Sequence, residues 1–238
     1  MTLQTSFDLL HFVYALIFFA IALKIRQSYL KDGKKELLLK YFMLAFFFWG
    51  GFEVARAAPH ISIVIGREDL FPRIMRWGYI ISHAFLILAA MYMAKVTARM
   101  FWPKYETLIF RVLIILGLIN VIYLIITPFT PTYNPAGVSP NNPPPLSLFL
   151  LTPILLIGFT LTALTFLYEA IKGKVTGILR TRALLLGIGI IMVIIGGPTH
   201  NFITTVSGWF ILDMTSLTGK LLAAAGVILC KPRNSIPT

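Results

Sequence analysis

The sequence predicts an all-α integral membrane protein with seven transmembrane helices, and three observations lead to that class. Of the 238 residues, 58% are hydrophobic and only 13% are charged, whereas a soluble domain has about 25% charged residues. The mean hydropathy is +0.83. The apolar residues gather in seven runs, each long enough to cross a hydrocarbon layer of about 30 Å. Because lipid cannot satisfy backbone polar groups and the runs lack strand-like alternation, we expect helices.

We expect one seven-helix transmembrane domain over residues 1–238. The sixth apolar run is short, because Gly196, Gly197 and Pro198 interrupt it and favour a break at one membrane face. Residues 128–145 contain seven prolines and no charge, which predicts an extended outer loop. The predicted helices lie at about 7–25, 37–58, 74–94, 107–127, 146–170, 183–200 and 209–230.

The basic residues predict the orientation. Sixteen of the 21 lysines and arginines lie in or beside the first, third and fifth loops and in the C-terminal tail, against four on the opposite side. The positive-inside rule therefore predicts an N-terminus outside and a C-terminus inside, in a multi-pass protein of the cell membrane. This distribution also accounts for the net charge of +12, so we expect contact with the lipid bilayer and no nucleic-acid partner.

The last apolar segment places a lysine near the middle of the membrane. Lys220 lies eleven residues after Trp209, which is about 16 Å along a helix. A lysine at a helix centre costs roughly 2.5 to 3.5 kcal/mol, so we expect it to face a polar interior. Asp213, seven residues earlier, shares that face, and Ser216 lies between them. The spacing favours Asp213 as the partner of Lys220.

Ionisable residues of other helices fall mostly in the predicted outer half. We therefore predict an outward-facing polar chamber that binds a small ligand, with His83 and Lys220 at its floor. We expect ion pairs between Arg76 and Asp213 and between Arg56 and Glu53 in its wall. The predicted ligand-binding residues are Lys220, Asp213, Ser216, His83, Arg76, Glu53 and Arg56.

Three short motifs resemble a known family. They are Trp49-Gly50-Gly51-Phe52-Glu53, Arg76-Trp77-Gly78-Tyr79 and the sequence RTRALLLGIGI over residues 180–190. They resemble the seven-helix input modules that precede prokaryotic histidine kinases, over roughly a third of the chain. The resemblance implies an N-out topology and a receptor-like or sensory function. Since no kinase sequence follows, we expect a separate cytoplasmic signalling partner, or a homo-oligomer, to carry the output.

A second interpretation is a small-solute transporter. Helices one to three and five to seven run in the same direction around the fourth, and residues 37–51 resemble residues 183–197. This pattern favours a 3+1+3 parallel repeat, the arrangement of the sugar-transporting SWEET proteins. The Pro-Gln signature of the related PQ-loop proteins is absent from the sequence.

Cofactor binding gives two further alternatives. His11, His83 and His200 are candidate ligands for a metal or for haem. Lys220, near the middle of the seventh helix, is where rhodopsins attach retinal, but the third helix lacks a carboxylate at a counter-ion position. No catalytic motif is recognised, so we expect no catalytic residues and favour a protein that is not an enzyme.

Overall fold

The computed structural model describes residues 3–31, 33, 36–129, 144–173, 175–197 and 205–228, with side chains in the first helix from Leu9 onward. Within these ranges every regular element is helical. The predicted all-α class is confirmed for these residues, and seven helical segments are long and apolar enough to cross a membrane. The elements are α1 (Leu3–Lys31), α2 (Leu37–Val64), η1 (Glu68–Leu70), α3 (Phe71–Phe101), η2 (Pro103–Tyr105), α4 (Glu106–Ile126), α5 (Pro145–Leu155), η3 (Leu156–Thr160), α6 (Leu161–Ile171), α7 (Gly177–Gly196) and α8 (Val206–Ile228).

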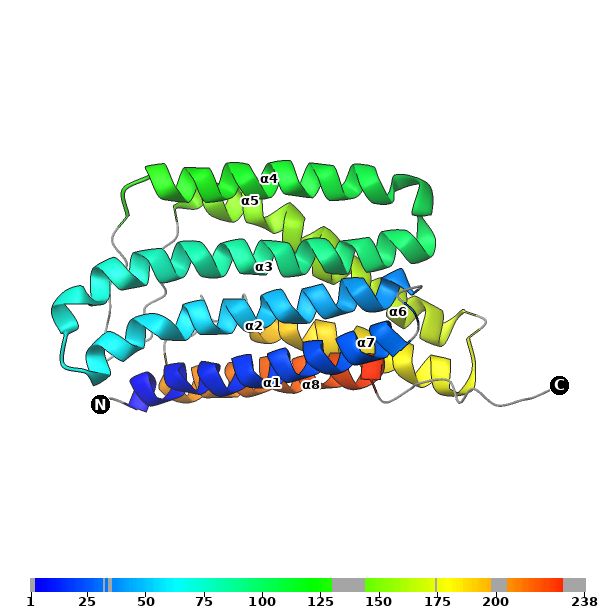
Figure 1. Cartoon of the computed structure of the whole chain (residues 1–238), viewed down its shortest axis with the longest axis horizontal. Coiled ribbons are helices and arrows are strands. Elements are labelled where there is room, and N and C mark those ends of the chain that lie inside the picture. Colours follow the sequence, from blue (N-terminus) through cyan, green and yellow to red (C-terminus); the bar gives the residue numbers. More distant parts are fainter. Residues whose placement is uncertain are drawn as a thin grey trace.

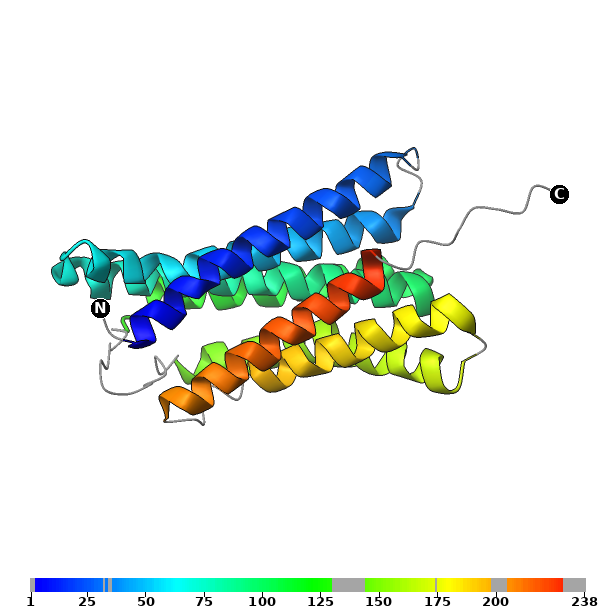
Figure 2. The ribbon, with the colours of Figure 1, turned by 90° about the horizontal axis from the view of Figure 1, so that it is seen from below.

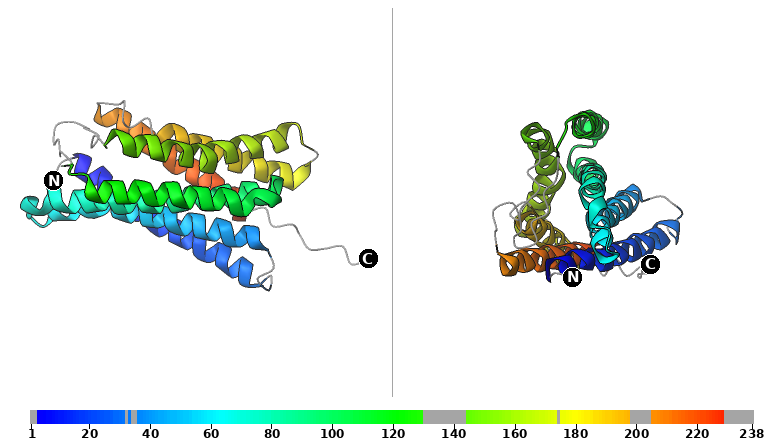
Figure 3. Two further views of the ribbon diagram at one scale, coloured as in Figure 1. Left: turned by 90° about the horizontal axis from the view of Figure 1, so that it is seen from above. Right: turned by 90° about the vertical axis from the view of Figure 1, so that its left-hand side faces the viewer.

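Successive spans run in alternate directions, so that the start of α1 and the end of α8 lie at opposite ends of the bundle (Figures 1 and 2). α5, η3 and α6 together form one span, Pro145–Ile171, called here the fifth span. Sequential spans pack side by side, and α8 closes the ring by contacting α1. The end view in Figure 3 places α1 and α8 along one edge of the bundle, with α4 and α5 at the opposite edge. α3 contacts α2, α4 and the fifth span, so it lies at the centre.

Several helices differ in length from their predicted bounds. α1 and α3 contain 29 and 31 residues, because the polar residues flanking each apolar run continue the helix beyond the hydrocarbon layer. α7 begins at Gly177 and ends at Gly196, which agrees with the break expected at Gly196–Pro198. Positions 198–200, most of the proline-rich loop and Cys230 lie outside the described residues.

The helix α2 continues through Pro59, where the sequence predicts an end at residue 58. A proline removes the N–H that would bond the carbonyl four residues earlier, which is that of Ala55. Gly78 of α3 packs against this point: a Cβ on Gly78 would lie 2.8 Å from Ala55 O and 2.8 Å from Pro59 Cγ. The close packing of α3 therefore holds α2 helical where its own hydrogen bonding is interrupted.

The fifth span contains a π-helical turn over Leu156–Thr160, three residues after Pro153. Gly158 allows this turn to approach α3, since a Cβ there would lie 2.5 Å from Ala90 O. Thr162 donates a hydrogen bond to Gly158 O at 2.7 Å and accepts one from Thr97 of α3 at 2.6 Å. A buried polar contact therefore fixes the fifth span against α3.

Glycines bring α7 and α8 into backbone contact. A Cβ on Gly189 would lie 2.5 Å from Gly219 O, and one on Gly196 would lie 2.6 Å from Leu212 O. Small residues allow such close approach in membrane helix pairs, where van der Waals packing drives association. The register of α8, which carries Asp213 and Lys220, is therefore fixed by α7.

Candidate functional site

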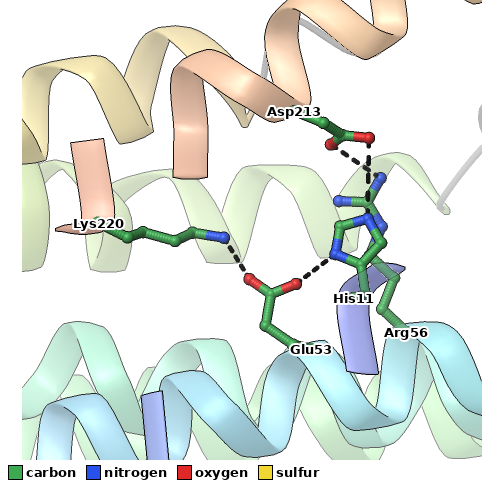
Figure 4. A network of polar contacts seen from close by, with 5 residues as sticks. All are labelled: His11, Glu53, Arg56, Asp213 and Lys220. Atoms are coloured by element: carbon green, nitrogen blue, oxygen red, sulfur yellow. Dashed lines mark hydrogen bonds and ion pairs between the residues drawn. The ribbon is translucent and has the colours of Figure 1, made fainter. Parts of the chain in front are cut away.

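Lys220 and Glu53 form a buried ion pair at the centre of the candidate site (Figure 4). Lys220 Nζ donates a hydrogen bond to Glu53 Oε1. The two residues are 4% and 0% exposed. Three aromatic rings surround the ammonium group, with the ring centroids of Phe18, Trp49 and Phe52 at 5.4, 5.8 and 6.0 Å from Nζ. The depth expected for Lys220 from the sequence is thus matched by a carboxylate partner and cation–π contacts.

His11 of α1 lies between two carboxylates. Its Nδ1 is 2.5 Å from Glu53 Oε2, and its Nε2 is 3.8 Å from Asp213 Oδ2. The residue is only 1% exposed. An ionised carboxylate accepts hydrogen bonds and cannot donate them. Only the imidazolium carries an N–H on both ring nitrogens. In that form, one N–H of His11 faces each of the two carboxylates.

Arg56 and Asp213 form the more accessible edge of the same group. Arg56 NH2 lies 3.7 Å from Asp213 Oδ1, and the two side chains are 26% and 8% exposed. The contacts of Asp213 with His11 and Arg56 are ion pairs longer than a direct hydrogen bond. We call His11, Glu53, Arg56, Asp213 and Lys220 the charged cluster; it joins α1, α2 and α8 (Figure 4).

The ion pairs differ from two of the predicted pairings. Lys220 pairs with Glu53, where we expected Asp213 to be its partner. Arg56 pairs with Asp213, where we expected Glu53 to be its partner. The reason is depth: Arg56 is about one helical turn nearer the C-terminal end of α2 than Glu53, level with Asp213 in the N-terminal half of α8. Ser216 is 6% exposed and packs on Gly196 of α7, since a Cβ on Gly196 would lie 2.7 Å from Ser216 Cβ.

Arg76 and His83 lie in a different region from the one predicted. Arg76 donates hydrogen bonds to Ile125 O at 3.0 Å and Thr127 O at 3.4 Å, at the end of α4. His83 Nδ1 is 2.8 Å from Tyr79 O, and the two rings are in contact, with centroids 3.9 Å apart and planes inclined at 32°. The prediction that Arg76 pairs with Asp213 is therefore wrong. α3 packs on α2, α4 and the fifth span, whereas α8 packs on α1 and α7, so His83 and Lys220 do not share one floor.

Glu106 forms a second buried network that the sequence interpretation missed. Tyr41 OH donates a hydrogen bond to Glu106 Oε1 at 2.6 Å, and Arg99 NH1 donates one to Oε2 at 3.3 Å. Lys95 Nζ lies 3.5 Å from Oε1. The signal available in the sequence was the pair Lys95 and Arg99 at i, i+4, followed by an acidic residue at the start of the next helix. This network ties α2, α3 and α4 at the end of the bundle opposite the N-terminus.

Two neutral polar residues were also missed. Asn120 of α4 and Ser147 of α5 are both 0% exposed. The side-chain amide of Asn120 and the hydroxyl of Ser147 have no hydrogen-bond partner. Their signal was a single polar residue in an otherwise apolar run, which is weak because it hardly changes the hydropathy.

The predicted metal ligands do not come together in the part of the chain that the structure describes. No group of three or more His, Cys, Asp or Glu side chains there is arranged to hold a metal ion. His11 and His83 belong to separate polar regions, as described above, and His200 lies outside the described residues. The bis-histidine haem site that His11 and His83 would form is therefore not assembled.

The chain matches no protein-family model, no curated protein and no solved structure. Its function is therefore argued from the geometry of the site.

Proposed function

We propose that the protein is a receptor-like or sensory membrane module that binds a small charged ligand at the charged cluster. The observation that carries the proposal is the buried set of ion pairs linking α8 to α1 and α2 inside a bundle of seven spans. Charged groups at such depth are costly, and in membrane proteins they usually mark ligand or ion sites. The resemblance to histidine-kinase input modules supports the same function.

The charge balance of the cluster indicates what kind of ligand fits. With His11 as the imidazolium, the cluster has three positive groups and two carboxylates, so a small carboxylate would balance its charge. The contacts of Asp213 with His11 and Arg56, at 3.8 and 3.7 Å, are the longest in the cluster. A small carboxylate placed between His11 and Arg56 would compete with Asp213. Loss of these contacts would leave Lys220–Glu53 as the link between α8 and α2 and loosen the N-terminal half of α8, and this shift is the proposed sensory signal.

The proposal includes an N-terminus outside and a C-terminus inside, which the lysine and arginine distribution supports. Two exposed glutamates at opposite ends of the bundle, Glu36 and Glu68, allow a direct test. Single cysteines would replace each of them in a background where Cys230 is serine, and intact cells would be treated with a membrane-impermeant thiol reagent. The proposed topology expects labelling at position 68 and none at position 36. The reverse pattern would contradict it.

Trp49 supplies an optical readout of the cluster. Its ring is 1% exposed, stacks on Phe18 and lies 5.8 Å from Lys220 Nζ. We would replace the other three tryptophans by phenylalanine and titrate the protein in lipid nanodiscs with acetate, succinate and glutamate. The sensory proposal expects a saturable change in Trp49 emission with at least one of these carboxylates.

Two matched arginine variants separate binding at the cluster from a general effect of the ligand. Arg56→Gln removes a cluster member and should abolish the response, whereas Arg67→Gln removes an exposed arginine that pairs with Asp69 and should preserve it. An unchanged response in Arg56→Gln would reject the cluster as the site. Counterflow of the same carboxylate in proteoliposomes would favour the transporter with a 3+1+3 repeat over the sensor.

Retinal binding is the second candidate function, because Lys220 has the carboxylate partner that the third helix lacks. Glu53 of α2 hydrogen bonds to its ammonium group and would stabilise a protonated imine formed on this lysine. An absorption spectrum of protein expressed with added retinal tests the candidate. A visible band bleached by hydroxylamine and missing in Lys220→Met would support it, and no such band would exclude it.

A further inference from the structure

Buried polar groups without hydrogen-bond partners occur where α3, α4 and α5 meet, apart from the charged cluster. Both polar atoms of Asn120 and the hydroxyl of Ser147 are unpartnered, although each residue is fully buried. Folded proteins rarely leave such groups bare, because burial removes their hydrogen bonds to water without replacement. Two unpartnered residues on neighbouring helices therefore indicate a place that a further molecule fills.

The register between α3 and α4 sets Asn120 opposite His83. Arg76 reaches Ile125 O of α4, and Gly117 packs on Ile87, since a Cβ on Gly117 would lie 2.7 Å from Ile87 Cγ2. Arg76 and Ile87 are eleven residues apart, which is about three helical turns on one face of α3. His83 lies on that same face between them, and antiparallel pairing from the Gly117 contact brings Asn120 level with it.

Ser147 belongs to the buried face of α5, with Leu151 and Ile154. The fifth span runs parallel to α3 (Figure 1), and its Gly158 packs against Ala90 of α3. Ser147 lies eleven residues before Gly158, and Tyr79 lies eleven residues before Ala90. Ser147 is therefore about level with Tyr79 along the bundle axis. This is one turn nearer the N-terminal end of the bundle than Asn120, or roughly 6 to 8 Å along the axis. α4 and α5 contact each other and both contact α3, so the three buried faces share one interior.

We propose that one small uncharged ligand, able to donate and accept hydrogen bonds, binds between α3, α4 and α5 and links His83, Asn120 and Ser147. We call these three residues the neutral wedge. An amide and a hydroxyl each both donate and accept, so they match a partner of the same kind. Neither of them supplies a charge to balance an ion. The separation of roughly 6 to 8 Å along the axis suits two linked waters, or one small solute with two hydroxyl or carboxamide groups.

Proton-detected solid-state NMR on the full chain in lipid bilayers tests this site. Asparagine would be labelled with ¹⁵N, and the side-chain signal of Asn120 would be assigned by its loss in Asn120→Leu. The expected result is a through-space cross-peak from the Asn120 amide protons to a bound molecule. Spectra would be recorded in water alone, and then with glycerol or with acetamide added.

The two sources of the same chemistry give different spectra. A water cross-peak that persists after each addition identifies internal water, and its replacement by a glycerol or acetamide cross-peak identifies a solute site. Ser147→Ala should weaken either cross-peak. Thr165→Val is the matched control, because Thr165 is partly exposed and already bonds to Leu161 O, so this variant should leave the cross-peak unchanged.

The absence of any cross-peak from Asn120 to water, glycerol or acetamide would overturn the proposal. Thermal unfolding gives a second criterion that does not need the NMR signal. If the wedge were bare, replacing Asn120 by leucine would remove an unpaired polar group and raise Tm by about 2 to 4 °C or more. With a bound partner, the same variant loses hydrogen bonds, so its Tm should be unchanged or lower.

Discussion

The charged cluster and the neutral wedge differ in how their buried polar groups are paired. In the cluster, Lys220, Glu53 and His11 contact one another, whereas in the wedge Asn120 and Ser147 have no partner in the protein. The difference follows from the size of the desolvation cost. A bare charge costs several kcal/mol, whereas an unpaired amide or hydroxyl costs about 1 to 3 kcal/mol. Buried charges must therefore be paired within the protein, whereas buried neutral groups can remain available to bind a ligand.

The largest expected effect comes from breaking the central ion pair. Lys220→Met leaves the fully buried Glu53 without its lysine and should lower the free energy of unfolding by about 3 to 5 kcal/mol. For a protein of this size, that corresponds to a Tm lower by roughly 6 to 20 °C. Thermal unfolding in lipid nanodiscs measures it. The double variant Lys220→Met with Glu53→Gln removes both charges and should recover much of the loss. If it were no more stable than Lys220→Met alone, the pair would not be the source of the effect.

Placing an unpaired charge in the neutral wedge tests whether a buried charge needs a partner within the protein. Asn120→Asp keeps the size of the side chain but adds a carboxylate that lacks the lysine present in the cluster. We expect a loss of about 2.5 to 3.5 kcal/mol at neutral pH. Protonation removes the charge, so the stability of this variant should rise relative to wild type as the pH falls. A loss that does not change with pH would show that packing, and not charge, causes it.

The edge of the cluster should be less sensitive than its centre. Asp213→Asn removes ion pairs of 3.7 and 3.8 Å whose partner Arg56 is 26% exposed. Both pairs are longer than a direct hydrogen bond, and the one with Arg56 is partly solvated, so we expect a loss of about 1 to 2 kcal/mol. Chemical unfolding of Asp213→Asn and Lys220→Met under the same conditions provides the comparison. An equal loss in the two variants would contradict the distinction between edge and centre.

The smallest effect is expected at Arg76, which was predicted to pair with Asp213. It bonds instead to carbonyls at the end of α4, partly exposed. Arg76→Gln should cost less than about 1 kcal/mol in the same unfolding measurement. A loss larger than that of Asp213→Asn would mean that Arg76 has a structural role beyond these hydrogen bonds.

The seven spans could be predicted from the sequence because hydropathy and helix length are local properties. The course of α2 through Pro59 could not, since the helix is held there by Gly78, a residue of the next helix. The same limit applies to the fifth span, which appears in the sequence as one apolar run. Its π-turn depends on the contact between Gly158 and Ala90 of α3.

The sequence predicts single residues of the candidate site but not how they pair. The depth of Lys220 and its need for a partner follow from composition and helical rise, and the structure confirms that it is buried. The sequence favoured Asp213 because it shares the helix, while the hydrogen-bonded partner is Glu53, 167 positions away. Spacing along one helix identifies a shared face, but it does not tell which other helices that face meets. Asn120 and Ser147 drew no attention because single neutral residues hardly alter an apolar run.

The π-turn at Leu156–Thr160 adds one residue to the fifth span without lengthening its path by a full helical step. Deleting one residue from this turn would restore a regular α-helix and keep the flanking parts of the span on their present faces. The same deletion elsewhere in the span would rotate the residues beyond it by about 100° and turn Thr162 away from Thr97, to which it is bonded at 2.6 Å. Homologous chains that keep this architecture should therefore tolerate the loss of one residue within positions 156–160 better than elsewhere in the span.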